Sequence, residues 1–169
     1  MSDYHRYTRE CAFSQFRSEL IKAIRDYNQD HHLGDIETEA LMCCQTTSEK
    51  KPPGFWASLL GDEPDKVYHT GMLVTPKWLV WARSGDKSGT VVSAAKLKDI
   101  QVKAFASRLL KDKGLEVYGM IGEARERMRG YIALGVEEAG QKFCEIVRQA
   151  VEETRQQTPR PKRRIFGLW

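Results

Sequence analysis

The sequence has no long apolar run, so none of its segments is expected to cross a membrane. An uninterrupted apolar stretch such as residues 78–82 falls far short of the roughly 18 residues that a spanning helix needs. Residues 1–10 are polar and lack the apolar core of a secretory signal. These absences predict a cytoplasmic protein, whose contact with a membrane would be limited to the membrane surface.

Cysteine is scarce, and its spacing excludes the common zinc sites. The four cysteines, Cys11, Cys43, Cys44 and Cys144, contain no Cys-x-x-Cys pair. A chain of 169 residues is long enough to bury a core without a disulfide or a metal. We therefore expect reduced, buried thiols. Because Cys43 and Cys44 are adjacent, a strand would point them to opposite faces.

Residues suited to catalysis are few and scattered. His31 and His32 are neighbours, whereas two metal ligands on one helical face need a spacing of four residues. The sequence has no Gly-x-Ser-x-Gly, P-loop or Gly-x-Gly-x-x-Gly motif, and its carboxylates are dispersed among lysines and arginines. Charges of both signs alternate within residues 122–129, and we expect them to neutralise one another. We therefore expect no cofactor, no metal and no enzymatic activity.

The composition, 41% apolar and 30% charged, is typical of a globular protein. The length predicts one domain with appendages. We expect an N-terminal amphipathic helix and linker over residues 1–34. A barrel with a capping helix would follow over 35–156, and a basic, aromatic tail over 157–169.

Residues 8–28 carry an apolar stripe with helical spacing. Its members recur every three or four residues and are Phe13, Phe16, Leu20, Ile24 and Tyr27. This stripe must be buried either on the chain's own barrel or on another chain, and the sequence leaves both open.

Short alternating segments predict six or seven strands in the middle of the chain. They are residues 40–47, 67–75, 78–83, 90–94, 100–105, 114–121 and 130–134. Alternation in one of them places side chains on two faces, with Trp78, Val80 and Ala82 on one and Leu79, Trp81 and Arg83 on the other. Because turn residues separate most of these segments, hairpins and an antiparallel sheet are expected.

The period becomes helical again over residues 136–156. Such a helix would cover an open side of the sheet and bury its apolar face there. The predicted fold class is therefore α+β. We expect a small antiparallel barrel or sandwich with a C-terminal capping helix and an additional N-terminal amphipathic helix.

Two stretches of the sequence carry information about the fold. In residues 69–81 one predicted strand ends in the turn Thr75-Pro76-Lys77, and the next begins at an aromatic residue, Trp78. Residues 130–135 run into the helix that carries Phe143. The first stretch resembles the pattern of the bacterial pleckstrin-homology-like (PH-like) family, and the second resembles the last strand and capping helix of a pleckstrin-homology fold. The resemblance implies a fold and leaves the function open.

The resemblance covers residues 37–155 and includes the loop between the first two predicted strands. Lipid-binding members carry a lysine and an Arg-x-Arg pattern near this loop, whereas this sequence has Lys50 and Lys51, followed by Phe55 and Trp56. The two aromatic residues suit insertion into a membrane interface or a partner groove. Packing over the chain's own barrel is the alternative.

Positive charge is concentrated in the last fifteen residues. The formal net charge of the whole chain is +4, whereas residues 155–169 hold five basic residues and no acidic one. Pro159 and Pro161 keep this tail out of the preceding helix. Cations would steer a partner and apolar side chains would anchor it, unless the tail folds back on its own barrel. The expected contact residues are Arg160, Lys162, Arg163, Arg164, Ile165, Phe166, Leu168 and Trp169.

These features favour a non-enzymatic adaptor or assembly factor. It would dock on a larger protein complex through the tail and the aromatic loop. The alternative is a peripheral module that binds anionic membrane lipids. Nucleic acid is not expected as a partner, because the remainder of the chain is nearly neutral and carries no nucleic-acid-binding motif.

Overall fold

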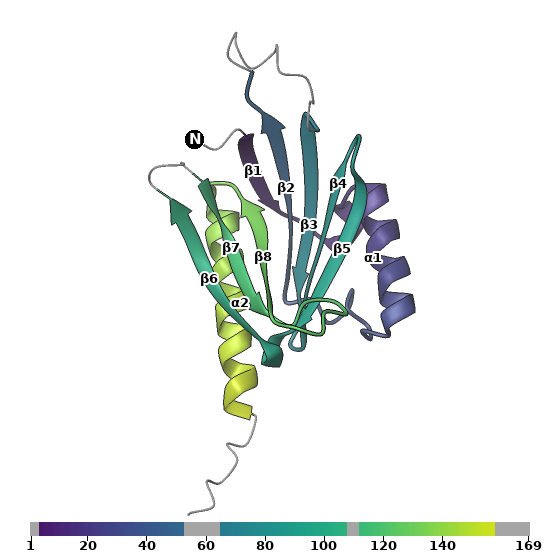
Figure 1. The fold of residues 1–169 in the computed structure, drawn as a ribbon, viewed down its shortest axis with the longest axis vertical. Helices are drawn as coiled ribbons and strands as arrows, with labels where there is room; N and C mark the ends of the chain where they lie inside the picture. The colour runs from purple at the N-terminus through teal and green to yellow at the C-terminus, as the bar shows by residue number, and fades with distance from the viewer. Residues whose placement is uncertain (1–3, 53–64, 108–111, 158–169) are drawn as a thin grey trace, which may run out of the picture.

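Two antiparallel sheets and two long helices make up the fold (Figure 1). The computed structural model describes residues 4–52, 65–107 and 112–157 of the chain. The elements are β1 (Tyr4–Glu10), η1 (Phe13–Gln15), α1 (Ser18–His31), β2 (Met42–Lys50), β3 (Val67–Val74), β4 (Trp78–Gly85), β5 (Gly89–Lys96), η3 (Leu97–Asp99), β6 (Ile100–Ser107), β7 (Asp112–Gly119), β8 (Met128–Leu134) and α2 (Glu138–Gln157). The α+β class, the antiparallel strands and the C-terminal helix are therefore confirmed.

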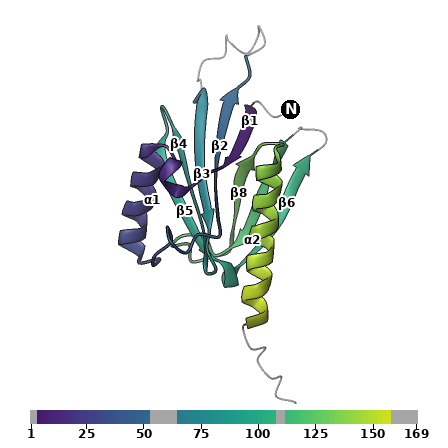
Figure 2. The ribbon, with the colours of Figure 1, turned by 180° about the vertical axis from the view of Figure 1, so that it is seen from behind.

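Each strand pairs with the next one along the chain, except where β5 passes to the second sheet. The larger sheet has the order β1-β2-β3-β4-β5 and the smaller β6-β7-β8. Within the described residues the two sheets do not close into a barrel, which corrects the expectation of one. Seen from behind, α2 lies over the gap between β1–β2 and β6 (Figure 2). Helix side chains, instead of a further strand pairing, cover that side of the core.

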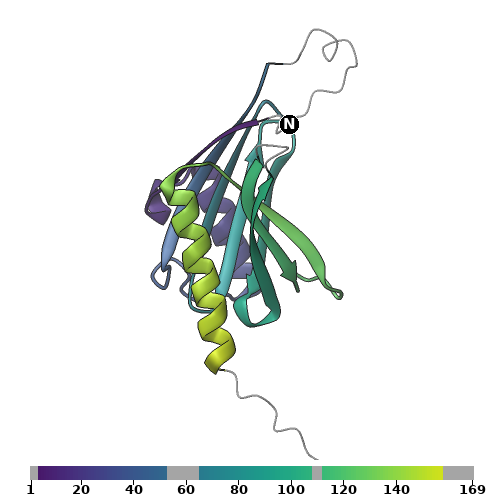
Figure 3. The same ribbon diagram turned by 90° about the vertical axis from the view of Figure 1, so that its left-hand side faces the viewer.

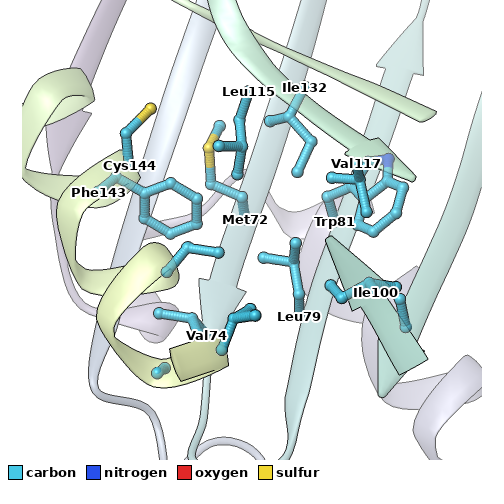
Figure 4. Packing of buried hydrophobic residues seen from close by; sticks show 14 of the residues in the cluster. Met72, Val74, Leu79, Trp81, Ile100, Leu115, Val117, Ile132, Phe143 and Cys144 are labelled. Atoms are coloured by element: carbon cyan, nitrogen blue, oxygen red, sulfur yellow. The ribbon is translucent and has the colours of Figure 1, made fainter. Parts of the chain in front are cut away.

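The main core lies between the two sheets and α2 (Figure 4). Met72, Leu79 and Trp81 point into it from the larger sheet, and Leu115 from the smaller one. Phe143 of α2 is fully buried among them. Burying each such side chain contributes about 1.5–3 kcal/mol, so this layer holds the two sheets and α2 together.

The opposite face of the larger sheet is covered by α1. Leu20 and Ile24 of α1 are fully buried in a second core, which also contains Leu73 and Val80. The central strands of the larger sheet, β2, β3 and β4, are therefore largely buried on both faces. The stripe of the N-terminal helix is buried on the chain's own sheet, which removes the reason for expecting it on another chain.

Strand alternation places side chains on the predicted faces. On β4, Val80 packs toward α1, whereas Leu79 packs toward the smaller sheet. On β2, Cys43 belongs to the second core and Cys44 to the main core. These predictions are confirmed because a strand with one core on each side must send neighbouring residues into different cores.

The N-terminal helix begins later than predicted. Residues 4–10 form β1 and α1 begins only at Ser18, so the helix predicted over residues 8–28 is wrong in its first half. β1 pairs with β2 along its whole length, with Thr8 opposite Thr46. This pairing satisfies backbone groups on the edge of β2 that a helix would have left open.

The body has two ends from which segments outside the described residues continue. At one end, at the top of Figure 1, β2 ends at Lys50 and β3 begins at Val67. At the other end α2 finishes at Gln157, and its last turn projects past the strands (Figure 3). We call this second end the α2 end. It also holds the β3–β4 turn, η3 and the connection between β7 and β8.

Candidate binding surface at the end of helix α2

Cationic side chains from separate parts of the chain meet at the α2 end. In an antiparallel meander successive connections alternate between its two ends, so the β3–β4, β5–β6 and β7–β8 connections come to the same end. They bring Lys77, Lys96, Lys98 and Arg127 there, and the last turns of α2 add Arg155. These five residues line two adjoining pockets.

The first pocket has a volume of about 170 Å³ and a polar lining. Its polar side chains are Lys98, Asp99, Gln101, Tyr118, Arg127 and Arg155. The guanidinium Nη2 of Arg155 donates a hydrogen bond of 3.1 Å to the backbone oxygen of Ile100. Because arginine has five N–H donors, this bond orients the side chain and leaves donors for a ligand.

The second pocket, of about 300 Å³, combines an aromatic wall with three lysines. Its lining is Pro76, Lys77, Trp78, Lys96, Lys98, Thr154 and Gln157. The Lys96 ammonium lies 5.4 Å from the centroid of the Trp78 ring, a cation–π contact. The Thr154 hydroxyl donates to the Ala150 oxygen within α2 at 2.8 Å and also lies 3.4 Å from the Pro76 oxygen, so α2 and the β3–β4 turn are neighbours here. Lys98 lines both pockets, so the two form one continuous surface.

The described part of the chain does not pair these cations with carboxylates. Within the described ranges none of the five forms an ion pair, and Asp99 is the one carboxylate among the lining residues. Several cations elsewhere on the surface are paired with carboxylates, as in Lys22–Asp26, Arg25–Glu37 and Lys142–Glu10. The negative end of the α2 dipole, about half a charge, weakens the positive field here without cancelling it.

Most of the residues predicted to bind a partner lie outside the described residues. They are Phe55, Trp56, Arg160, Lys162, Arg163, Arg164, Ile165, Phe166, Leu168 and Trp169. Lys50 and Lys51 are described, and both are half-buried at the end of the body opposite the α2 end. The backbone N–H of Lys50 donates to the Lys66 oxygen at 2.7 Å. The structure therefore does not bring these two lysines to the end from which the tail continues.

The pocket-lining lysines were not found from the sequence. Lys77 lies in the β3–β4 turn, Lys96 ends β5 and Lys98 lies in η3, so the three do not form a linear basic motif. The available signal was the alternation of the predicted turns, which places these connections at one end of the sheet.

The charges within residues 122–129 do not pair among themselves as expected. The described ion pairs of this segment run to partners outside it, Glu123 to His31 at 3.6 Å and Arg129 to Glu116 at 3.1 Å. Arg127 lines the first pocket instead. Glu123 of the connection thus contacts α1, and Arg129, near the start of β8, contacts β7.

The buried thiols are poorly suited to nucleophilic chemistry. Burial raises the pKa of Cys43 to about 11 and that of Cys44 to about 12, so both are protonated at neutral pH. Burial lowers the pKa of His69, whose Nδ1 lies 3.3 Å from the Thr47 hydroxyl. In the part of the chain that the structure describes, no group of His, Cys, Asp and Glu side chains is arranged to hold a metal ion.

Neither protein families nor curated sequences indicate a function for the chain. No protein-family model matches the chain, and no curated protein sequence matches it significantly. None of the described helices is both long and apolar enough to span a bilayer. The function is therefore inferred from the surface at the α2 end.

Proposed function

We propose that this protein is a non-enzymatic adaptor or assembly factor that docks on a larger protein complex through its α2 end. The proposal is carried by the unpaired cations of the body that line the two pockets there. Residues 158–169 continue the chain from the same end and add Arg160, Lys162, Arg163 and Arg164. Body and tail thus contribute positive charge at one end, which favours an acidic partner surface.

Charge and apolar area would have separate roles in this docking. Clustered cations accelerate the encounter with an acidic surface and set its orientation. The affinity would come from the apolar residues Phe166 and Leu168, each worth about 1.5–3 kcal/mol when buried against a partner. Trp169 adds a side chain of the type that dominates interface energetics.

The aromatic loop with Phe55 and Trp56 is proposed as a second contact. The strands that flank it, β2 and β3, meet it at the end of the body opposite the α2 end. Two contacts that start from opposite ends suit a protein that bridges two components of an assembly.

We also propose that the fold is PH-like. The support is the position of α2, which follows the last strand and covers the open side between the two sheets. This is the arrangement implied by the resemblance of residues 130–135 and Phe143. In this proposal β1 and α1 are additions that extend the first sheet and cover its outer face.

The second pocket favours an alternative, a peripheral module that binds anionic membrane lipids. There Trp78 is half-buried and lies among Lys77, Lys96 and Lys98. Tryptophan is typical of the membrane–water interface, and each lysine near an anionic surface contributes up to about 1 kcal/mol. In this alternative the apolar residues of the tail insert into the bilayer.

The test compares the full chain with a full-length variant in which the tail cations are replaced, R160Q/K162Q/R163Q/R164Q. An adaptor should co-elute with a discrete protein assembly in host-cell extract at physiological salt, and the variant should elute alone. A control with the same change of charge elsewhere on the body, R83Q/K103Q/K113Q/R148Q, should behave as the original chain.

Sedimentation with lipid vesicles distinguishes the lipid-binding module from the adaptor. A lipid-binding module should sediment with phosphatidylcholine vesicles that contain phosphatidylserine, and salt should release it. Sedimentation without co-elution would replace the adaptor proposal with the lipid-binding one. If the chain shows neither behaviour, both functions are rejected.

A further inference from the structure

We propose that the first pocket at the α2 end is a binding site for a phosphoryl group. The inference does not rest on the proposed function, because it is argued from the described lining residues, all of which belong to the body. Three cations, Lys98, Arg127 and Arg155, face a single carboxylate, Asp99, in this pocket. An anion is therefore the ligand that the lining charge favours.

The donors in the pocket match the geometry of a phosphoryl group. Arginine presents a planar fork of N–H groups that matches two phosphate oxygens, and lysine adds a point charge. The Arg155 fork is held in place by its 3.1 Å bond to the Ile100 oxygen. Gln101 and Tyr118 add neutral donors, an amide and a hydroxyl. A tetrahedral oxyanion accepts hydrogen bonds from several directions. The donors in this pocket come from several elements and would approach such a group from different sides.

The pocket is large enough for such a group and shares a wall with its neighbour. Its volume of about 170 Å³ is well above the ~10–15 Å³ that a cavity needs to hold one water. It therefore holds a phosphoryl group with some of its hydrating water. Because Lys98 also lines the second pocket, the remainder of a larger ligand would extend past Trp78.

The backbone around the pocket is fixed before any ligand arrives. Gly119 ends β7 with φ of 145°, and a Cβ there would lie 2.3 Å from the backbone oxygen of Asp99. Glycine thus allows β7 to approach η3 closely, and the Met120 N–H donates to the same oxygen at 3.4 Å. A preformed wall lowers the cost of ordering that a ligand must overcome.

Two arginines close together in sequence differ in whether the protein pairs them. Arg129 is paired with Glu116 at 3.1 Å, so the protein satisfies that cation itself. Arg127, two residues earlier, has no ion-pair partner within the described residues and lines the pocket. Its charge remains available to an external anion.

The experiment is a titration of the full-length protein with inorganic phosphate, at constant ionic strength maintained with chloride, followed by amide NMR. The proposal expects saturable shifts concentrated at Gly119 and Met120. The variant K98Q/R127Q should bind phosphate at least about tenfold more weakly, because two charged hydrogen-bond partners are lost. The control K103Q/R125Q makes the same change of charge at exposed residues outside the pocket and should bind as the original chain does.

Vesicles then identify the source of the phosphoryl group. Phosphatidylcholine vesicles with phosphatidic acid expose a phosphate monoester, and vesicles with phosphatidylserine are matched to them in surface charge. Preferential binding to phosphatidic acid that is lost in K98Q/R127Q but kept in K103Q/R125Q identifies a lipid headgroup. Saturable phosphate binding without this preference identifies a soluble phosphorylated ligand.

Other outcomes overturn the site. They are an absence of saturable shifts in the original chain, shifts spread over the whole surface, or an equal loss in K98Q/R127Q and K103Q/R125Q. The titration of the original chain decides the matter even if a variant fails to fold. Failure here leaves the docking proposal standing, because a positively charged surface can attract an acidic partner without holding a phosphoryl group, and docking is measured separately by co-elution.

Discussion

The backbone N–H of Gly135 donates a hydrogen bond of 2.7 Å to the hydroxyl of Thr8, a residue 127 positions earlier. The same hydroxyl lies 2.7 Å from that of Thr46, and the Thr8 N–H donates to Glu137 Oε2 at 2.9 Å. Gly135 permits this approach, since a Cβ there would lie 2.9 Å from the Thr8 nitrogen. One buried threonine therefore joins β1, β2 and the junction between β8 and α2.

Replacing Thr8 with valine keeps the shape of the side chain and removes its acceptor. The buried Gly135 N–H would then lack a partner, which costs about 1–3 kcal/mol. We expect the free energy of unfolding, measured by urea denaturation, to fall by about this amount. Thr38 is exposed, so Thr38→Val serves as the control. It should change the free energy of unfolding by less than about 0.5 kcal/mol. An equal effect of the two substitutions would show that the Thr8 hydroxyl does not hold the junction.

Asp65 is expected to make stability depend on pH on the acidic side. Its carboxylate accepts hydrogen bonds from the backbone N–H groups of Lys87 and Ser88 in the β4–β5 hairpin. Hydrogen bonding, first of all from the Ser88 side chain, holds the pKa of Asp65 below its usual value. Because the folded pKa lies below the unfolded value of about 3.9, the stabilisation is present above that pH and is lost as the pH falls.

Asp65→Asn should therefore lower the melting temperature near neutral pH, and the difference from the original chain should vanish in strong acid. Thermal denaturation over a range of pH values checks this. Asp86 is exposed in the same hairpin, so Asp86→Asn serves as the control and should show no such convergence. A difference between Asp65→Asn and the original chain that persists unchanged into strong acid would contradict the role of the ionised carboxylate.

Cys44 is expected to weaken the fold at alkaline pH. Burial raises its pKa to about 12, whereas an unfolded thiol titrates near about 8.5. The folded state thus holds the proton more tightly, so the stabilisation is complete below pH 8.5 or so and declines as the pH rises toward the folded value. The melting temperature should therefore fall less steeply with rising pH in Cys44→Ala than in the original chain. Parallel curves for the two proteins would rule out this thiol as a cause.

The larger sheet was predictable because its central strands are consecutive and alternate locally. The segment predicted over residues 67–75 is β3, Val67–Val74, and the faces of β4 follow directly from alternation. β1 was not predictable in this way. Thr8 of β1 pairs with Thr46, which is 38 positions away in the sequence. The apolar residues with helical spacing begin nearby at Phe13, so the predicted helix was extended wrongly into the residues that form β1.

The α2 end was predictable in part. Lys77 and Arg127 lie in predicted turns, and counting the strands between those turns places both at one end of the sheet. The pockets themselves were not predictable. They depend on side-chain packing between distant segments, such as the contact of Arg155 with the Ile100 oxygen, and on carboxylates being paired elsewhere.

The remaining prediction concerns Phe166 and Trp169, which lie in the tail outside the described residues. If they anchor an external partner, the full-length variant F166A/W169A should unfold with the same free energy within about 0.5 kcal/mol. Loss of two anchors worth about 1.5–3 kcal/mol each should weaken retention of the host assembly at least about a hundredfold. Urea denaturation and retention on immobilised protein measure the two quantities.

The control for this variant removes exposed apolar groups from the body. Tyr7 and Val91 are each 59% exposed, so Y7A/V91A should leave retention unchanged. If instead F166A/W169A lowers the free energy of unfolding by about 3 kcal/mol or more, the two side chains are part of the chain's own core. Docking through the tail would then be wrong, because residues already buried on the body have no apolar surface to offer a partner.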